Sequence, residues 1–167
     1  MATQNNLKEA FAGESQANRM YLAFAKKAEQ DGFPGVARLF RATAEAETVH
    51  AHAHFRAMGS VKDTAANLDT AAEGEGYEFQ KMYPTFLEEA EAEGASRAVI
   101  TSFKYAMAAE EVHHGLYRKA VEMVKAGKDL DGAAIYLCPF CGNIEIGTVP
   151  DTCPICGAPK AKFVEVA

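Results

Sequence analysis

The sequence predicts a mainly α-helical protein, a four-helix bundle followed by a small cysteine-rich module with β structure. Helix formers such as alanine and glutamate dominate the first three quarters of the 167-residue chain, with apolar residues at alternating steps of three and four. Parts of this region repeat after about 62 residues, and all four cysteines lie between 138 and 156. We therefore expect a helical domain at 1–127, a linker at 128–134 and a metal-binding module at 135–167.

Four helices are expected in the first domain, and each ends near a glycine, which readily adopts the positive φ of a helix terminus. The expected helices span 4–31, 35–58, about 70–93 and about 95–126, and the glycines are Gly32, Gly59, Gly94 and Gly127. The first and last connections are short, which makes the helices that they join antiparallel neighbours. In the stretch 60–70 the apolar residues show only weak helical periodicity, so we expect a longer connection there.

The helical part contains an internal repeat. The repeated residues are Met20, Tyr21, Phe24, Phe40, Glu47 and His50, which recur as Met82, Tyr83, Phe86, Phe103, Glu110 and His113. The four helices are therefore two copies of one αα-hairpin. Two packed copies generate a pseudo-twofold axis, and we expect a two-metal site to lie on that axis.

Composition excludes several classes of function. The formal net charge of −6 and the lack of an evident basic face argue against binding of a nucleic-acid backbone. No apolar run approaches the roughly 20 residues of a membrane span. The N-terminus lacks the basic start and apolar stretch of a signal peptide, so we expect a cytoplasmic protein. In that reducing compartment the cysteines are metal ligands rather than disulfides.

Two Glu-x-x-His pairs, Glu47 with His50 and Glu110 with His113, indicate metal binding. Residues i and i+3 share one helix face, so each pair presents a carboxylate and an imidazole to one ion. Further glutamates precede the pairs: Glu14 in the first hairpin, and Glu75 and Glu78 in the second. One Glu from each of two helices and a Glu-x-x-His from each of the others form a two-metal site in a bundle core.

Most helical glutamates are solvated, so a surface role is the alternative for these residues. Along each helix, apolar residues at alternating steps of three and four form a row that faces the core, which we call the apolar seam. The glutamates of the proposed site lie in the middle of these seams. Burying a carboxylate without a partner costs roughly several kcal/mol, and a bound cation offsets this cost. Five carboxylates nearly neutralise the +4 of two divalent ions or of two trivalent ions bridged by an oxide. Carboxylate-rich sites with imidazoles favour iron or manganese over zinc.

The position of each remaining histidine relative to the apolar seam predicts whether it faces solvent or the core. Glu111 and His114 form an overlapping Glu-x-x-His one residue off the seam, so we expect both to face solvent. His52 is also off the seam. His54 lies on the seam one turn beyond the ligands, and we expect a packed, hydrogen-bonded core histidine there.

The cysteines form two C-x-x-C pairs, Cys138 with Cys141 and Cys153 with Cys156, and a glycine follows each pair. Four thiolates in this pattern form a tetrahedral site for zinc or for a single iron. A structural zinc ribbon is the alternative. The neighbouring redox-active centre favours iron, because iron passes single electrons and zinc does not.

Taken together, the chain resembles the rubrerythrin family over nearly its full length. The motifs that carry the resemblance are Gly13-Glu14-Ser15-Gln16-Ala17, Ala44-Glu45-Ala46-Glu47-Thr48-Val49-His50, Gly74-Glu75-Gly76-Tyr77-Glu78, Met82-Tyr83-Pro84 and Glu110-Glu111-Val112-His113. The C-terminal part resembles the rubredoxin-like module and closes with Gly157-Ala158-Pro159-Lys160.

The resemblance implies a ferritin-like di-iron bundle, oxo-bridged when oxidised. The implied ligands of both irons are Glu14, Glu47, Glu75, Glu110 and His113. It further implies that one iron exchanges Glu78 for His50 on reduction. Tyr21 and Tyr83 resemble the family's tyrosines that hold ligand carboxylates in place.

The implied activity is a peroxidase that reduces hydrogen peroxide to water in oxidative-stress defence. Electrons then enter through the cysteine-bound iron from a reductase or a rubredoxin-type protein, and the protein is a homodimer or higher homo-oligomer. An iron-handling ferroxidase with a structural zinc ribbon is the main alternative, although storage needs no dedicated electron inlet. A non-catalytic metal or redox sensor ranks last, since no DNA-binding element is evident.

Overall fold

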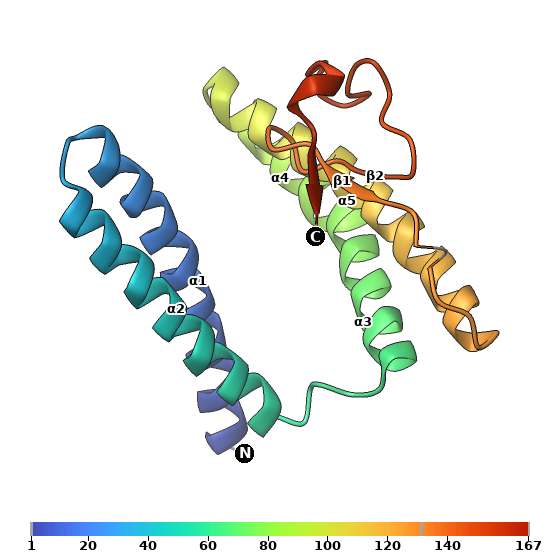
Figure 1. Ribbon diagram of the computed structural model, residues 1–167, viewed down its shortest axis with the longest axis horizontal. Coiled ribbons are helices and arrows are strands. Elements are labelled where there is room, and N and C mark those ends of the chain that lie inside the picture. The colour runs from blue at the N-terminus through green and yellow to red at the C-terminus, as the bar shows by residue number, and fades with distance from the viewer. Residues whose placement is uncertain (1, 131, 167) are drawn as a thin grey trace. The chain divides into compact units, whose positions relative to one another are not determined.

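The computed structural model describes residues 2–130 and 132–166 (Figure 1). The helices are α1 (Ala2–Gln30), α2 (Pro34–Ala57), α3 (Thr64–Tyr77), a π-helix (Glu78–Met82), α4 (Tyr83–Ala92) and α5 (Arg97–Lys125). The strands are β1 (Ile135–Leu137), β2 (Ile144–Ile146) and β3 (Val164–Val166). The chain divides into two compact units, residues 1–62 and 63–167, and each is a separate body.

The first unit is the hairpin of α1 and α2, which lie side by side in Figure 1. The turn between them uses Gly32 at φ 81°, and Pro34 begins α2 at a position where its missing N–H is no loss. Buried alanines lie along the two helices, and their small side chains allow close approach: Ala25, Ala28, Ala37, Ala44 and Ala51. Phe11 and Phe55 stack across the open end at 4.7 Å.

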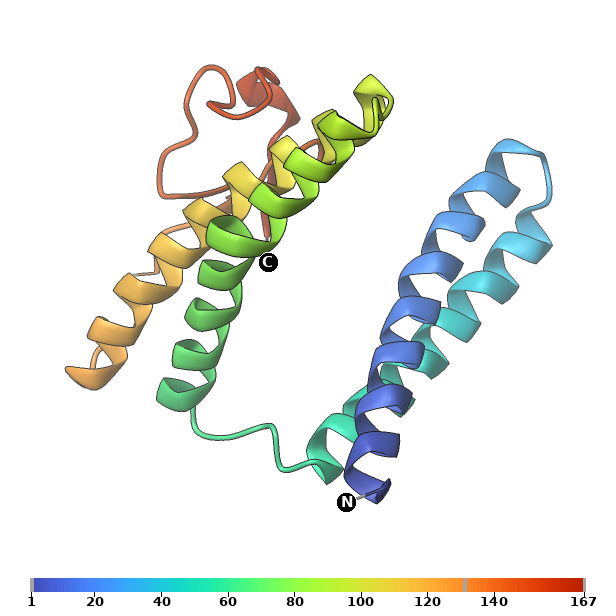
Figure 2. The same ribbon diagram turned by 180° about the vertical axis from the view of Figure 1, so that it is seen from behind.

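The second unit packs α3, the π-helix and α4 along α5 (Figure 2). α3 begins at Thr64, because the carboxylate of Asp63 accepts the backbone N–H of Ala66 at 2.9 Å. Such an N-cap stabilises a helix by about 1 kcal/mol. The prediction of a connection at 60–70 is therefore wrong beyond residue 63, where α3 has already begun. The four glycines expected to end the helices all follow a helix in the structure, and each adopts a positive φ.

The π-helix corrects a mismatch between the two copies of the repeat. Glu14 and Tyr21 are seven residues apart, which is two α-helical turns, whereas Glu75 and Tyr83 are eight apart. A π-helix accommodates one extra residue in a helix. With that residue absorbed between positions 78 and 82, Glu75 keeps the same relation to Tyr83 as Glu14 has to Tyr21. Pro84 then stands in the first turn of α4.

The cysteine module is a three-stranded antiparallel sheet in the order β2-β1-β3, with two cysteine knuckles at one end. Gly142 and Gly157 follow the knuckles at φ 84° and 75°, the positive values that were predicted. Cys138, Cys141 and Cys153 form a buried cluster against Tyr105 of α5 and Phe163. The module therefore packs directly on the helix that carries the second Glu-x-x-His pair.

Within residues 2–130 and 132–166, every helix is too short or too polar to qualify as a membrane span.

Candidate metal centres

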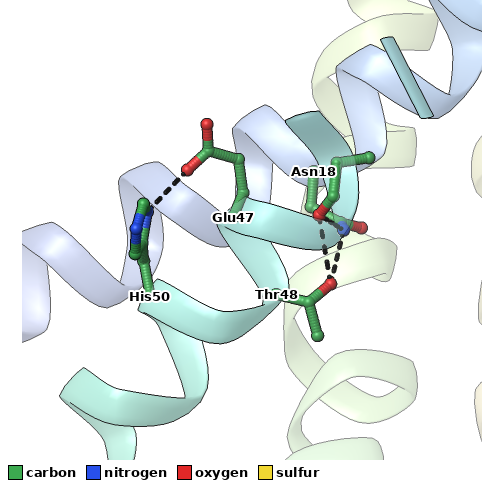
Figure 3. A network of polar contacts seen from close by, with 5 residues as sticks. Asn18, Glu47, Thr48 and His50 are labelled. Atoms are coloured by element: carbon green, nitrogen blue, oxygen red, sulfur yellow. Dashed lines mark hydrogen bonds and ion pairs between the residues drawn. The ribbon is translucent and has the colours of Figure 1, made fainter. Parts of the chain in front are cut away.

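The first unit gathers Glu14 of α1 with Glu47 and His50 of α2. One potential ligand atom from each lies within 4.8 Å of the others. Glu47 and His50 point toward one another in Figure 3, with the carboxylate oxygen 3.0 Å from Nδ1. The histidine side chain is 55% exposed, whereas that of Glu47 is 15% exposed. This group of three is thus open to solvent within its own unit.

Asn18 holds the two helices together at this level (Figure 3). Its Nδ2 donates to the carbonyl of Ala44 at 2.7 Å and lies 2.8 Å from the hydroxyl oxygen of Thr48. These contacts cross from α1 to α2 one turn from Glu14. They fix the separation of the helices where the three potential ligands meet.

The second unit gathers Glu75 of α3 with Glu110 and His113 of α5, again within 4.8 Å. The Nδ1 atom of His113 is 2.7 Å from Glu110 and 3.6 Å from Glu75. All three side chains are largely buried, between 17% and 23% exposed. A contact of 2.7 Å between Nδ1 and a carboxylate oxygen is a short hydrogen bond, which places a proton between the two atoms.

Electrostatics around this second group favour a cation. Burial, followed by the neighbouring Glu110, raises the pKa of Glu75, and His113 offsets the rise only in part. Burial and the charge of Glu75 raise the pKa of Glu78, which lies at the start of the π-helix. The pKa of Tyr83 is raised by burial and then by the nearby carboxylates. A metal ion among these groups removes the repulsion between the carboxylates.

The four cysteines are free thiols that converge on one point. The sulfur of Cys138 lies 3.6 Å from that of Cys156, and the sulfur of Cys141 lies 3.5 Å from that of Cys153. A tetrahedral site with metal–sulfur bonds of about 2.3 Å has sulfur–sulfur edges of about 3.8 Å. Burial raises the pKa of the Cys141 thiol well above its ordinary range, which disfavours a free thiolate. The donor set fits a four-coordinate metal.

A single peptide group joins the two centres of the second unit. His113 donates from Nε2 to the carbonyl oxygen of Gly142 at 2.9 Å. The N–H of the same peptide bond belongs to Asn143 and donates to the sulfur of Cys141. Because a carbonyl only accepts, the proton of the neutral ring resides on Nε2. Nδ1 is then free to bind a metal.

Asn143 anchors this peptide group. Its side chain is completely buried, and its Nδ2 donates to Glu145 at 2.9 Å. Its backbone carbonyl accepts the N–H of Cys138 at 2.8 Å. Nothing in the sequence pattern had placed Gly142 or Asn143 beside a bundle ligand.

The predicted di-iron ligands thus fall into two groups of three, one in each unit. Their union into one site of seven residues, with Glu78 as the seventh, stays a prediction. The predicted tyrosines occupy equivalent places in their hairpins. Tyr21 packs against Phe40 at 6.1 Å, and Tyr83 packs against Phe103 at 6.2 Å.

One expectation about the remaining histidines is wrong. His114 is half-buried rather than solvent-facing, and its Nδ1 lies 2.7 Å from the carbonyl oxygen of Ala72. Its ring occupies the space beside Gly76, where an added Cβ would lie 3.1 Å from Nδ1. The absence of a side chain at Gly76 lets this histidine tie α5 to α3. Glu111 and His52 are exposed as predicted, and the hydrogen bond expected of His54 stays a prediction.

Comparison with known proteins identifies the family of the chain. The rubrerythrin family model matches residues 5–121, and the model of the rubredoxin-like domain of rubrerythrin matches residues 136–164. The chain belongs to the rubrerythrin family. It is 35% identical to Rubrerythrin-2 of Clostridium acetobutylicum over 96% of this chain and 95% of that protein. It is 40% identical to nigerythrin of Nitratidesulfovibrio vulgaris over 97% of this chain and 85% of the relative.

Solved structures of nigerythrin resemble the fold. The fully reduced, all-ferrous form aligns with a TM-score of 0.60 at 36% identity, and the mixed-valence form with 0.59 at 37%. Both alignments cover 98% of this chain and 86% of the other. The predicted family, the mainly α ferritin-like fold and the two metal cofactors are thereby confirmed. The rubrerythrin family comprises di-iron oxidoreductases of oxidative-stress defence with a rubredoxin-like four-cysteine site.

Proposed function

We propose that this rubrerythrin is a cytoplasmic peroxidase that reduces hydrogen peroxide to water at a di-iron site. The observation that carries the proposal is the Gly142–Asn143 peptide, which contacts His113 on one side and Cys141 on the other. When bound, the iron pair supplies the two electrons that peroxide cleavage needs, and the cysteine-bound iron passes electrons singly. A ferroxidase of the storage type has no need of such a connection.

The proposed ligands of the iron pair come from both helical units. Glu14 and Glu47 come from the first unit, and Glu75, Glu110 and His113 come from the second. Glu78 and His50 are the proposed exchanging pair. His113 is the fixed ligand, because its Nε2 proton is committed to Gly142 and its ring is largely buried. Tyr21 and Tyr83 are proposed to orient the carboxylates.

The decisive experiment separates electron delivery from peroxide reduction. In Cys141→Ser, reductase-driven peroxide turnover should fall at least tenfold, since that thiol accepts the Asn143 N–H and ligates the metal. Once both iron sites of the bundle are filled, oxidation of the chemically reduced bundle by one equivalent of peroxide should keep its rate. If the single-turnover rate fell as far as steady-state turnover, the cysteine site would belong to the peroxide site or to its fold. A protein that oxidises added ferrous iron rapidly but ignores peroxide would be the ferroxidase.

A second experiment asks which chains supply the two halves. Chains with Glu47→Gln lack a first-unit ligand, and chains with Glu110→Gln lack a second-unit ligand. If the halves come from different chains, refolding the two variants together restores one intact site per dimer. If each chain closes on itself, the mixture stays as inactive as its parents. Iron content per dimer, measured beside peroxide turnover, decides between the two arrangements.

A further inference from the structure

His114 fills a space between the two helices that carry the ligand group of the second unit. Its ring lies beside the buried Gly76, where an added Cβ would come within 3.1 Å of Nδ1. Nδ1 lies 2.7 Å from the carbonyl oxygen of Ala72. A carbonyl only accepts, so Nδ1 carries the proton that it donates to α3. Gly76 follows Glu75 and His114 follows His113 in the chain, so this contact lies at the level of the ligands.

The same ring also contacts the π-helix. It packs against the half-buried ring of Phe79, with ring centroids 5.5 Å apart and planes tilted by 50°. Phe79 directly follows Glu78, whose carbonyl accepts the N–H of Tyr83 at the end of the π-helix. Burial and the charge of Glu75 raise the pKa of Glu78 and the charge of His113 lowers it, so its carboxylate lies near both groups. The imidazole therefore holds the backbone segment that presents this carboxylate.

The first hairpin has smaller side chains at the equivalent places. In the repeat, Ser15 corresponds to Gly76, and Ala51 corresponds to His114. Ser15 and Ala51 line an open groove of about 230 Å³. Ala51 is nevertheless buried, with 6% of its surface exposed. One copy of the hairpin thus packs without an imidazole at this place, so the histidine of the other copy has a role beyond closing the hairpin.

We infer that His114 is a positioning residue for Glu78: through Phe79 it holds the start of the π-helix and keeps the Glu78 carboxylate beside the other ligands. The inference rests on the proposed exchange of Glu78 for His50. A carboxylate stabilises ferric iron more than an imidazole does, so holding Glu78 in place favours the oxidised state of one iron. Loosening this contact should ease the release of Glu78 and favour the reduced state.

The midpoint potential of the bundle iron, measured in a double-mutant cycle, tests this role. His114→Ala should shift the preference about threefold toward the ferrous state, which raises one midpoint potential by about 30 mV. In a protein that already carries Glu78→Ala, the same change should have no effect, because the carboxylate that it acts through is gone. An equal shift in both backgrounds would overturn the inference, since the imidazole would then act on the iron by another route. His52→Ala removes an exposed histidine and should leave the potential unchanged.

A second variant displaces the ring without removing it. Gly76→Ala improves helix propensity but places a Cβ 3.1 Å from the imidazole, so the ring must move. It should raise the same potential as His114→Ala does, and the two changes together should add nothing, because the added Cβ then meets no ring. Gly74→Ala, at an exposed glycine of the same helix with open space around it, is the control. A shift from both glycine variants, or from neither, would overturn the role of the ring.

The metal-free protein provides a readout that needs no iron. His114→Ala should speed hydrogen exchange of the backbone amides at 79–83 about tenfold, while the amides at 86–92 in α4 keep their rates. Faster exchange throughout α3, α4 and α5 would mean a general loss of stability and would overturn the inference. If Glu78→Ala leaves the potential unchanged, the proposed ligand exchange is wrong and this inference falls with it. If Glu78→Ala shifts the potential and His114→Ala does not, only the positioning role is wrong.

Discussion

The two helical hairpins are copies of one unit, yet their ligand groups differ in how firmly they are held. His50 in the first hairpin is 55% exposed and lies 3.0 Å from Glu47, whereas the equivalent His113 is 17% exposed and held at both ring nitrogens. The second hairpin also contains a π-helix and the additional Glu78. The histidine of the second hairpin is thus more buried and has more contacts than its counterpart in the first. This difference agrees with the proposal that the second hairpin holds the fixed ligand and the first the exchanging one.

The largest effect is expected from removing the two equivalent histidines in turn. His113→Ala should lower the affinity of the bundle for iron about 100-fold in both oxidation states, since it removes a ligand and the tie to Gly142. His50→Ala should weaken binding of ferrous iron and leave ferric iron nearly unchanged. Equilibrium iron binding under anaerobic and oxidised conditions measures both. Equal losses in the two variants would mean that the hairpins are not divided into fixed and adjustable halves.

A deletion in the π-helix tests why the second hairpin needs an extra residue. Removing Gln80, which is exposed, should convert the π-helix to an α-helix and leave Glu75 seven residues before Tyr83, the spacing of Glu14 and Tyr21. This variant should therefore keep its iron. Removing the exposed Gln16 from α1, which has no extra residue to lose, should turn Glu14 by about 100° relative to Tyr21 and cost the bundle roughly half of its iron. Iron content per chain measures both variants, and equal losses would show that the π-helix does not absorb the extra residue.

Glu78 provides a test of intermediate size. A carboxylate stabilises ferric iron more than an imidazole does, so Glu78→Ala should leave two irons bound and raise one midpoint potential. A tenfold change in preference corresponds to about 60 mV for one electron. Glu111→Ala, an exposed neighbour of Glu110, is the matched control and should leave the potential unchanged. Crystals in oxidised and reduced forms decide whether one iron moves, and identical ligands in both would exclude the exchange.

The smallest effect concerns the metal-free protein and its dependence on pH. Burial and Glu110 raise the pKa of Glu75, so its contribution to stability is complete below the ordinary value of 4.5 and is lost as pH rises through the raised pKa. Glu75→Gln should therefore stabilise the metal-free protein at pH 7 but not at pH 4. Chemical unfolding at both values measures this, with Glu73→Gln as the exposed control. A stabilisation that persisted unchanged at pH 4 would contradict the assigned cause.

Much of the helical architecture could be predicted, because its determinants are local. Glycines that end helices and the i, i+3 spacing of Glu47 with His50 are visible in a few residues of sequence. The cysteine knuckles carry an equally local signal in Gly142 and Gly157. Each of these features depends on neighbours within one or two turns, so chain spacing alone defines it.

The features that escaped prediction depend on single residues or on distant contacts. The early start of α3 depends on one capping side chain, Asp63, ahead of a stretch with weak periodicity. The π-helix leaves composition unchanged and is visible only as one extra residue in the repeat. His114 looked solvent-facing on its own helix, because only the packing of α3 brings Gly76 against it. The contact of His113 with Gly142 spans 29 residues and has no local signal.

The peptide between Gly142 and Asn143 has a thermodynamic consequence. Metal in the four-cysteine site orders the Cys141 knuckle, and that knuckle holds the carbonyl that orients His113. Linkage requires the reverse influence to be equally large, so metal at His113 strengthens binding at the cysteines by the same factor. The two centres are therefore expected to fill cooperatively. A chain that acquires its first metal at either site becomes the better competitor for the second when iron is scarce.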